Sequence, residues 1–378
     1  MTKTGGPAVE ERETKKALDA TARTCRDLLA KGKPLAPHIK DRDLAALQER
    51  YSRFEDRTDN EGYVIDSLNT VHRPLTPRPY FHALHNFQIS GRAYGTLWDQ
   101  SGRGFSYLSA LRGGGVTRNV GSPYKPLYAA EKDQRAFYLR EKNAGGVYAD
   151  DAGDKLNAWS LFPLADSRAC HYTDFRCTQS RSFVSLEAVK QQVAAALTVM
   201  VPMGRCAEVW KLSLKNLSQK KRDLDLFVRV DWSLLTYPAS RLNRGEFYHA
   251  EFQKKLSALL VRNVDITDKN PRTAFLATDA AITGFEFSGE RFDAPFSCDL
   301  TPGAVIQGVL SSSDSAPVGE PPISGLHIRV TLPAGGAKTF FFALGAAAGT
   351  DADACKEIDA LKKGTFSEKG FASALAAA

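Results

Sequence analysis

The chain has 378 residues, of which 43% are hydrophobic and 25% are charged, and its formal net charge at pH 7 is +7. These proportions are ordinary for a globular protein and exclude a wholly disordered chain. The excess of 50 Lys and Arg over 43 Asp and Glu is small for this length. It is also spread along the chain, so it gives little support to a nucleic-acid partner.

Residues 1–58 are the first predicted unit, a helical N-terminal extension. Apolar side chains recur at helical spacing in two segments, at Leu18, Ala22, Cys25 and Leu29 and again at Leu44, Leu47, Tyr51 and Phe54. Pro34 and Pro37 lie between the segments and should interrupt the helix. We expect two short helices on a domain edge, with a partner-binding helical hairpin as the alternative.

From residue 59 to 346 the pattern changes to short β-rich runs separated by turn residues. The predicted strands are Ala93–Trp98, Gly104–Ser109, Arg135–Arg140, Ser182–Val189, Gln192–Val201, Cys206–Lys215, Arg222–Val230, Leu256–Asn263, Thr273–Thr278, Gly325–Leu332 and Ala337–Leu344. Apolar and polar residues alternate clearly in Arg222–Val230 and Gly325–Leu332. This alternation predicts a mainly β fold, a large antiparallel two-sheet β-sandwich.

Two connections are predicted around these strands. Asn216–Lys221 separates two strong strands and is interpreted as a hairpin loop with a solvated basic tip. The segment 347–378 returns to helical spacing, with Cys355, Ile358 and Leu361 on one face of Asp351–Lys363. The sandwich is therefore expected to have short helical segments at both its N-terminal and C-terminal ends.

The chain's location is predicted from what its sequence lacks. Met1–Lys16 is polar, without the apolar segment of a secretory signal, and the longest apolar run, Val193–Val201, is too short to span a bilayer. The six cysteines are scattered without a C-x-x-C pair, so free thiols are expected. We expect a soluble cytoplasmic protein, or the cytoplasmic part of one, without a membrane partner.

Histidines and cysteines gather at two places. His72, His82 and His85 lie near prolines, and their spacing matches no familiar metal site, so polar loop histidines are favoured over a metal centre. For Cys170 and Cys177 a strand-to-strand thiol pair is favoured over zinc. No metal site or cofactor is predicted.

Two glycine-rich strings are candidates for ligand contact. Arg112–Arg118 (RGGGVTR) could bring backbone amides and two guanidinium groups to an anion, but a flexible hairpin loop with exposed arginines is the favoured interpretation. Gly104-Phe105-Ser106-Tyr107 places aromatic rings beside glycines and Arg103, a composition that suits a sugar. The alternative is that Phe105 and Tyr107 share one face of a strand and pack the core.

Catalytic motifs are weak. The sequence contains no G-x-S-x-G, H-E-x-x-H, Walker A or Rossmann glycine pattern. The acids of 150–154 fall in a glycine-containing turn, and Glu246 and Glu251 flank an aromatic stretch without a visible partner. A facing carboxylate pair is not recognisable from one sequence, so no catalytic residue is assigned.

The order of several short motifs resembles the N-terminal supersandwich domain of glycoside hydrolase family 94, the cellobiose and chitobiose phosphorylase group. The motifs are Gly62–Ile65 with Pro77–Tyr80, Ser101–Tyr107, Val116–Arg118, Arg135–Arg140, Ala207–Asn216 and Phe340–Gly345. They resemble that family's "YVI…TP-x-PW", "N-x-GGYSF", "R-[IV]-TR", "GRYFYIRD", "AEIW…IKN" and closing "F-x-LG" elements. Tyr80 stands where Trp is usual, and Arg103 interrupts the glycine doublet.

The resemblance implies a galactose mutarotase-like sandwich and an activity on sugars. In that family a helical linker and an (α/α)6 barrel follow the sandwich, and the barrel carries the catalytic acid and most phosphate contacts. The resemblance thus implies a domain lacking the barrel, with 347–378 as the start of the linker. It implies an oligosaccharide, a catalytic barrel and a second copy as partners, and inorganic phosphate as co-substrate of the full enzyme.

Arg103, Phe105, Tyr107 and Arg118 are the expected contacts to sugar, to a partner barrel or to phosphate. Three functional hypotheses remain open. The first is the N-terminal part or split subunit of an inverting β-glycoside phosphorylase. The second is a stand-alone, non-catalytic carbohydrate-binding or subunit-interface module. The third is an independent hydrolase with an unrecognised carboxylate pair.

Overall fold

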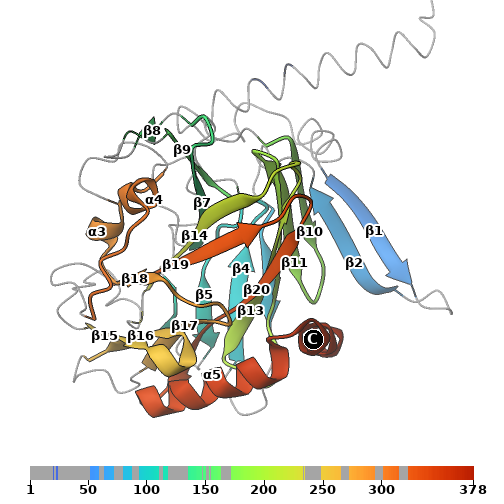
Figure 1. The fold of residues 1–378 in the computed structure, drawn as a ribbon. Helices are drawn as coiled ribbons and strands as arrows, with labels where there is room; N and C mark the ends of the chain where they lie inside the picture. The colour runs from blue at the N-terminus through green and yellow to red at the C-terminus, as the bar shows by residue number, and fades with distance from the viewer. Residues whose placement is uncertain are drawn as a thin grey trace, which may run out of the picture.

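The fold was analysed in a computed structural model. It describes residues 20, 23, 52–58, 64–71, 80–86, 93–109, 114–117, 135–146, 148–149, 153, 155–162, 172–232, 234, 248–264, 272–293, 301–314 and 322–378. The named strands pair antiparallel and form three sheets (Figure 1). The mainly β, two-sheet prediction is confirmed, and a smaller third sheet is added to it.

The largest sheet has ten strands in the order β1-β2-β10-β11-β12-β13-β20-β17-β16-β15. The strands are β1 (Ser52–Thr58), β2 (Val64–Val71), β10 (Asp174–Gln179), β11 (Val184–Lys190), β12 (Val193–Met200), β13 (Ala207–Asn216), β15 (Tyr248–Gln253), β16 (Ala258–Asn263), β17 (Arg272–Thr278) and β20 (Ala337–Ala348). The tight turn between β11 and β12 has positive φ at Gln191 (51°) and Gln192 (59°), the left-handed backbone conformation that two-residue hairpin turns favour because it matches the right-handed twist of the strands.

The second sheet has six strands in the order β18-β19-β14-β7-β9-β8, and the third has four in the order β3-β4-β5-β6. The six strands are β7 (Arg135–Lys142), β8 (Tyr148–Ala149), β9 (Lys155–Ser160), β14 (Arg222–Asp231), β18 (Gly284–Glu286) and β19 (Ile323–Leu332). The four are β3 (His82–His85), β4 (Ala93–Trp98), β5 (Ser106–Ser109) and β6 (Gly114–Gly115).

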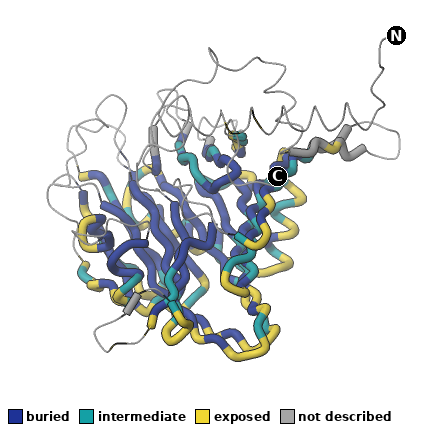
Figure 2. Tube along the Cα trace, turned by 90° about the horizontal axis from the view of Figure 1, so that it is seen from above, coloured by how far each residue is buried: buried dark blue, intermediate teal, exposed yellow. Residues whose placement is uncertain are grey.

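One hydrophobic core joins the three sheets. Its side chains come from the ten-stranded sheet (Trp210, Phe342), the six-stranded sheet (Phe137, Leu226) and the four-stranded sheet (Trp98). Figure 2 shows that buried residues continue through the strands, while exposed residues gather at turns and on the C-terminal helices. Burial of this continuous apolar volume is the main force that holds the layers together.

The C-terminal helices α5 (Asp351–Thr365) and α6 (Glu368–Ala377) cover the outer face of the ten-stranded sheet (Figure 1). Ile358, Leu361 and Phe371 pack there against Phe275 and Phe341 in a second core. Strand β20 is therefore buried on both faces, which explains its continuous apolar run. The predicted helix Asp351–Lys363 is confirmed.

Two short helices cover part of the outer face of the six-stranded sheet. Phe292 of α3 (Gly289–Asp293) and Val305 of α4 (Gly303–Gln307) pack against Tyr138 and Phe227 in a third core. The outer face of β14 is therefore less polar than its sequence alternation predicts.

The helical prediction for 1–58 is wrong at its C-terminal end, where Ser52–Thr58 is strand β1. Its seven residues pair with β2, for example Phe54 with Asn69. The helical pattern at Leu44, Leu47, Tyr51 and Phe54 covers only a few turns. Hydrogen bonding of Ser52–Thr58 to β2 therefore determines the conformation of its last residues. Ala20 and Arg23 are helical, and the other residues of this unit, like His72, Arg112, Arg118 and Cys170, lie outside the described residues.

The hairpin prediction for Asn216–Lys221 is also wrong, because β13 and β14 belong to different sheets. The segment is a corner held by Asn216, whose side-chain amide donates to the carbonyl oxygens of Lys220 (2.7 Å) and Pro333 (3.0 Å). Asn216 Oδ1 accepts from the Ser218 amide at 2.9 Å. These local bonds satisfy the backbone while the chain crosses between layers.

Two further predictions change in detail. The strand expected over Gly104–Ser109 begins at Ser106, because Gly104 has a φ of 143° and approaches the Leu97 carbonyl closely. His82 and His85 lie on strand β3 instead of in a loop. Cys177, on β10, is a buried free thiol.

Candidate functional site

The predicted contact residues divide between the two sides of the four-stranded sheet. Ser106 and Leu108 of β5 are buried toward the core, whereas Phe105 and Tyr107 are half-buried and lie outside the main core. Their ring centroids are 5.9 Å apart. The alternative that these two rings simply pack the core is therefore wrong, because strand alternation turns them to the outer face.

Arg103 lies on the turn that joins β4 to β5. This turn is held by Asp99, whose Oδ1 accepts hydrogen bonds from the amides of Ser101 (2.8 Å) and Arg103 (2.9 Å) and from the Ser101 hydroxyl (2.7 Å). Burial raises the pKa of Asp99 above its usual value, and the hydrogen bonds from Ser101 and the Arg103 backbone oppose this shift. The turn is thus fixed by a carboxylate that the sequence analysis did not single out.

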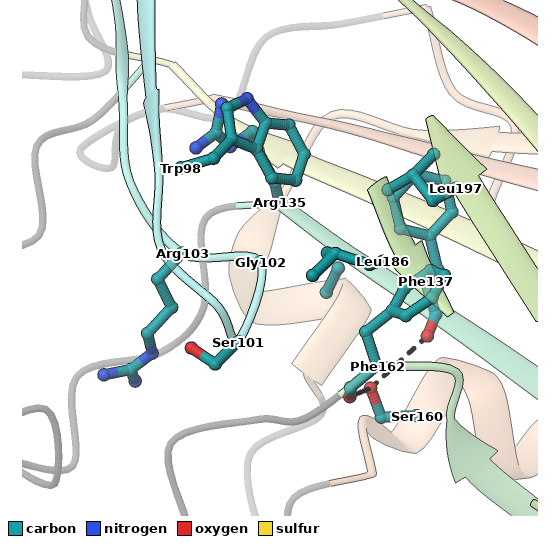
Figure 3. Close-up of a pocket in the computed structure, with 11 residues that line it drawn as sticks. Trp98, Ser101, Gly102, Arg103, Arg135, Phe137, Ser160, Phe162, Leu186 and Leu197 are labelled. Atoms are coloured by element: carbon teal, nitrogen blue, oxygen red, sulfur yellow. Dashed lines mark hydrogen bonds between the residues drawn. The ribbon is translucent and has the colours of Figure 1, made fainter. Parts of the chain in front are cut away.

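A cavity of about 10 Å³ lies beside this turn. Trp98, Gly102, Arg103, Phe137 and Leu186 contribute to its lining, and Figure 3 shows the Arg103 side chain pointing away from Leu186 and Phe137. A cavity of this size holds about one water molecule. It is too small for a sugar, and the rings of Phe105 and Tyr107 do not line it.

Behind the four-stranded sheet lies a buried ion pair between Arg135 of β7 and Glu208 of β13. Glu208 Oε1 accepts from the Ser106 hydroxyl at 2.6 Å, and its Oε2 accepts from the Trp98 indole at 3.0 Å. The Tyr94 hydroxyl also donates to Glu208 (3.4 Å). This carboxylate therefore joins strands of all three sheets.

Arg135, like Glu208, makes several contacts with the four-stranded sheet. It donates to the Thr96 hydroxyl at 2.8 Å and to the Leu97 carbonyl at 2.6 Å, and its guanidinium lies 3.8 Å from the centre of the Trp98 ring. Burial lowers the pKa of Arg135, and the charge of Glu208 opposes that shift. We interpret this network as structural: its groups are buried and hydrogen-bond to each other, so it links the three sheets.

A second cluster lies on the outer side of the six-stranded sheet, where Asp225 accepts from His327 (2.8 Å) and from Arg140 (2.9 Å). Burial alone would raise the pKa of Asp225, but the hydrogen bond and charge of His327, followed by those of Arg140, lower it below its usual value. The His327 ring stacks on Phe227 with centroids 4.5 Å apart.

The other buried acids are also paired. Arg229 donates to Asp231 at 2.7 Å and to Asp293 at 2.5 Å. Of the acids considered from sequence, Glu251 accepts from Gln253 at 2.6 Å. Asp150, Asp151, Asp154 and Glu246 lie outside the described residues. Within the described part of the chain, no group of three or more His, Cys, Asp or Glu is placed to hold a metal ion.

No helix in the described ranges is both long and apolar enough to cross a membrane. Of the four expected contact residues, the structure brings Phe105 and Tyr107 together, places Arg103 on the neighbouring turn, and leaves Arg118 outside the described residues. The buried partners Tyr94, Trp98, Arg135 and Glu208 were missed as a cluster, although the resemblance motifs contain two of them.

Comparison with known proteins gives a family. The model of the glycosyl hydrolase 94 supersandwich domain matches residues 63–363. An N,N'-diacetylchitobiose phosphorylase of Vibrio proteolyticus is 23% identical over 297 residues, covering 78% of this chain and 33% of the relative. A 3-O-β-D-glucopyranosyl-β-D-glucuronide phosphorylase of Paenibacillus borealis is 23% identical over 303 residues, covering 77% and 34%.

Among solved structures, a bacterial glucoamylase complexed with acarbose aligns with a TM-score of 0.38 and 9% identity, covering 68% of this chain and 32% of that one. The chain spans about a third of the length of the curated relatives that it matches.

Proposed function

Because the chain belongs to the glycosyl hydrolase 94 supersandwich family, we propose that it is the sandwich part of an inverting β-glycoside phosphorylase. The complete enzyme would catalyse reversible phosphorolysis of a β-linked glucosaccharide to a sugar 1-phosphate. The family match over residues 63–363 carries this proposal. The phosphorylase names of its relatives, and the share of their length that it spans, support it.

The proposed reaction needs two groups on opposite faces of the sugar. A carboxylic acid protonates the leaving oxygen while inorganic phosphate, the co-substrate, attacks the anomeric carbon from the other side. In this proposal neither group is held by the sandwich. A helical barrel, as a further domain or a second subunit, supplies the acid and most phosphate contacts, and the sandwich supports it.

Three carboxylates of the described residues are consistent with this division of labour. Glu208, Asp225 and Asp231 are each engaged by an arginine, so their negative charges are compensated within the fold. We place the protein in the cytoplasm, with an oligosaccharide, the barrel and a second copy as partners, without a resident cofactor, nucleic acid or membrane.

The test combines the chain with the barrel. If a helical-barrel sequence continues this reading frame or lies in a neighbouring one, the two parts are purified together and incubated with phosphate and a series of β-linked disaccharides. Release of sugar 1-phosphate by the combination, but not by this chain alone, is the expected result. Turnover by the chain alone, abolished by one Asp or Glu substitution, would contradict the proposal and establish an independent hydrolase or phosphorylase.

The second candidate is a stand-alone, non-catalytic carbohydrate-binding or subunit-interface module. It is compatible with the pairing of Glu208, Asp225 and Asp231 with arginines, because a binding or interface module needs no free catalytic acid. Absence of any barrel sequence near the gene, together with saturable disaccharide binding by the purified chain, would favour this module over the phosphorylase part.

A further inference from the structure

The outer face of the four-stranded sheet has an aromatic ring between two glycines. The strand registers place His85, Gly95, Tyr107 and Gly115 in one row across β3, β4, β5 and β6. The Tyr107 ring leans over Gly95. A methyl group on that glycine would lie 2.4 Å from Cζ and 2.6 Å from the hydroxyl oxygen of Tyr107. Only glycine leaves room for the ring to lie against β4 in this way.

A second row extends this surface. Leu97 is half-buried and receives Phe105 as its cross-strand neighbour through the bond from its amide to the Phe105 carbonyl (2.8 Å). On β3 and just before it, Ala83 is exposed and Phe81 is 38% exposed. We call the face made by Phe81, Ala83, Gly95, Leu97, Phe105 and Tyr107 the aromatic shelf. None of these six residues carries a charge.

From this geometry we propose that the aromatic shelf binds a neutral pyranose ring, with Tyr107 as the stacking surface. The inference rests on the proposed carbohydrate function and names a site for it. A pyranose presents a flat face of C–H groups that packs on an aromatic ring, while its hydroxyl groups point outward from the edge. The residues paired with Tyr107 on the two neighbouring strands are Gly95 of β4 and Gly115 of β6. Because glycine has no side chain, neither residue competes with a sugar for the space beside the ring.

The polar groups of the shelf also fit a neutral sugar. The Tyr107 hydroxyl makes no hydrogen bond to any residue that the structure describes, so it is available to a sugar hydroxyl. His85, at the end of the row, is exposed. The six shelf residues include no Lys or Arg, and the nearest guanidinium in the described sequence, that of Arg103, belongs to the adjoining β4–β5 turn, so a phosphate or a uronate stacked on Tyr107 finds no counter-charge among the shelf residues themselves. The shelf therefore favours an uncharged sugar unit.

The structure provides a matched pair of variants. Tyr107→Ala removes the stacking surface, and Tyr107→Phe keeps the ring but removes its hydroxyl. Gly95→Ala leaves Tyr107 in the chain but places a methyl group where its ring lies. Phe252→Ala is the control, because Phe252 is also half-buried and paired with a second ring, Phe285 at 4.6 Å, on a different sheet.

Binding of cellobiose and of N,N'-diacetylchitobiose to the full chain is measured by calorimetry and by saturation-transfer NMR, with circular dichroism to verify folding. We expect Tyr107→Ala and Gly95→Ala to weaken binding by about tenfold. We expect a smaller loss in Tyr107→Phe and no change in Phe252→Ala. In the NMR measurement, the sugar's C–H protons should receive saturation from aromatic protons, and this transfer should disappear in Tyr107→Ala.

Two results would overturn the shelf. One is wild-type binding that persists unchanged in folded Tyr107→Ala and Gly95→Ala, which would put the sugar elsewhere on the chain. The other is absence of binding of both sugars by the wild-type chain. Neither result touches the proposed function, because that is decided by release of sugar 1-phosphate from the chain combined with its barrel.

Discussion

At the scale of single residues, Glu208 is the acid whose loss should cost the most. It is fully buried, is paired with buried Arg135, and also accepts from Ser106 and Trp98. Glu208→Gln keeps the shape but leaves the Arg135 charge uncompensated. We expect the free energy of unfolding, measured by urea denaturation, to fall by about 3–5 kcal/mol.

Glu187→Gln is the matched control for this prediction. Glu187 is also paired with an arginine, Arg176, but the two side chains are 39% and 52% exposed. Water screens such a pair, so its loss should cost at most about 1 kcal/mol. Equal losses in the two variants would show that Thr96 and the Leu97 carbonyl compensate Arg135 without Glu208.

Asp225 gives a pH dependence. Its pKa is lowered in the folded protein, so it contributes stability above its unfolded pKa of about 3.9, and that stability is lost as the pH falls through the lower folded pKa. Asp225→Asn should therefore reduce the free energy of unfolding by about 1–3 kcal/mol near pH 7. The difference from wild type should shrink below pH 4. A difference that is constant from pH 7 to pH 3.5, in urea titrations, would contradict this.

These residue networks are hard to predict from sequence, because their members are distant in the chain. Trp98 and Glu208 are separated by 110 residues, and Arg135 and Glu208 by 73. Arg135 and Glu208 lie in motifs that the sequence analysis identified, and Trp98 ends a predicted strand. Only the fold shows that these three side chains contact one another. Phe105 and Tyr107 were recognised as neighbours because i, i+2 spacing on one strand is a local property.

At the scale of elements, helix α5 is attached to the sheet by Lys362. Its ammonium group donates to the carbonyl oxygens of Leu256 (2.5 Å), the last residue of the 3-10 helix Lys254–Leu256, and of Thr278 (2.7 Å), the last residue of β17. Burial lowers the pKa of Lys362, and the charge of Asp279 opposes the shift. Lys362→Met should leave both carbonyl groups without this donor and destabilise the docked helix by about 1.5–3 kcal/mol.

Hydrogen–deuterium exchange is the measurement for this variant. Amides of α5 should exchange faster in Lys362→Met, while those of β11 and β12 should keep their wild-type protection. Lys363→Met is the control, because Lys363 is exposed. Unchanged exchange in α5 would show that Ile358 and Leu361 hold the helix without the ammonium group.

Elements with strong local patterns were predictable, and those defined by distant partners were not. The strands β14 and β19 followed from alternation, although α3 and α4 cover part of the outer face of this sheet and His327 on that face is buried. Strand β1 was mistaken for helix because its partner β2 alone defines it. The corner at Asn216 has the same kinds of turn residue as a hairpin loop. It differs from a hairpin because β13 and β14 belong to different sheets, and this cannot be read from the local sequence.

At the scale of the whole molecule, the C-terminal helices belong to the stability of the sandwich. Ile358, Leu361 and Phe371 cover Phe275 and Phe341 on the outer face of the ten-stranded sheet. Removing residues 351–378 would expose this apolar face. Exposed apolar patches of several hundred Å² promote association. We therefore expect the truncated chain to self-associate and to bind the dye ANS more strongly than the full chain does.

Light scattering after size-exclusion chromatography measures this association. A shorter truncation, of residues 368–378, removes Phe371 but keeps Ile358 and Leu361 in place, so it should show a smaller increase in mass and in ANS binding. Both truncations remove chain, but they uncover different amounts of the same face, so a graded response identifies that face as the cause. If the longer truncation instead kept the mass and ANS fluorescence of the full chain, segment 347–378 would act only as a linker that rests on a self-sufficient sandwich.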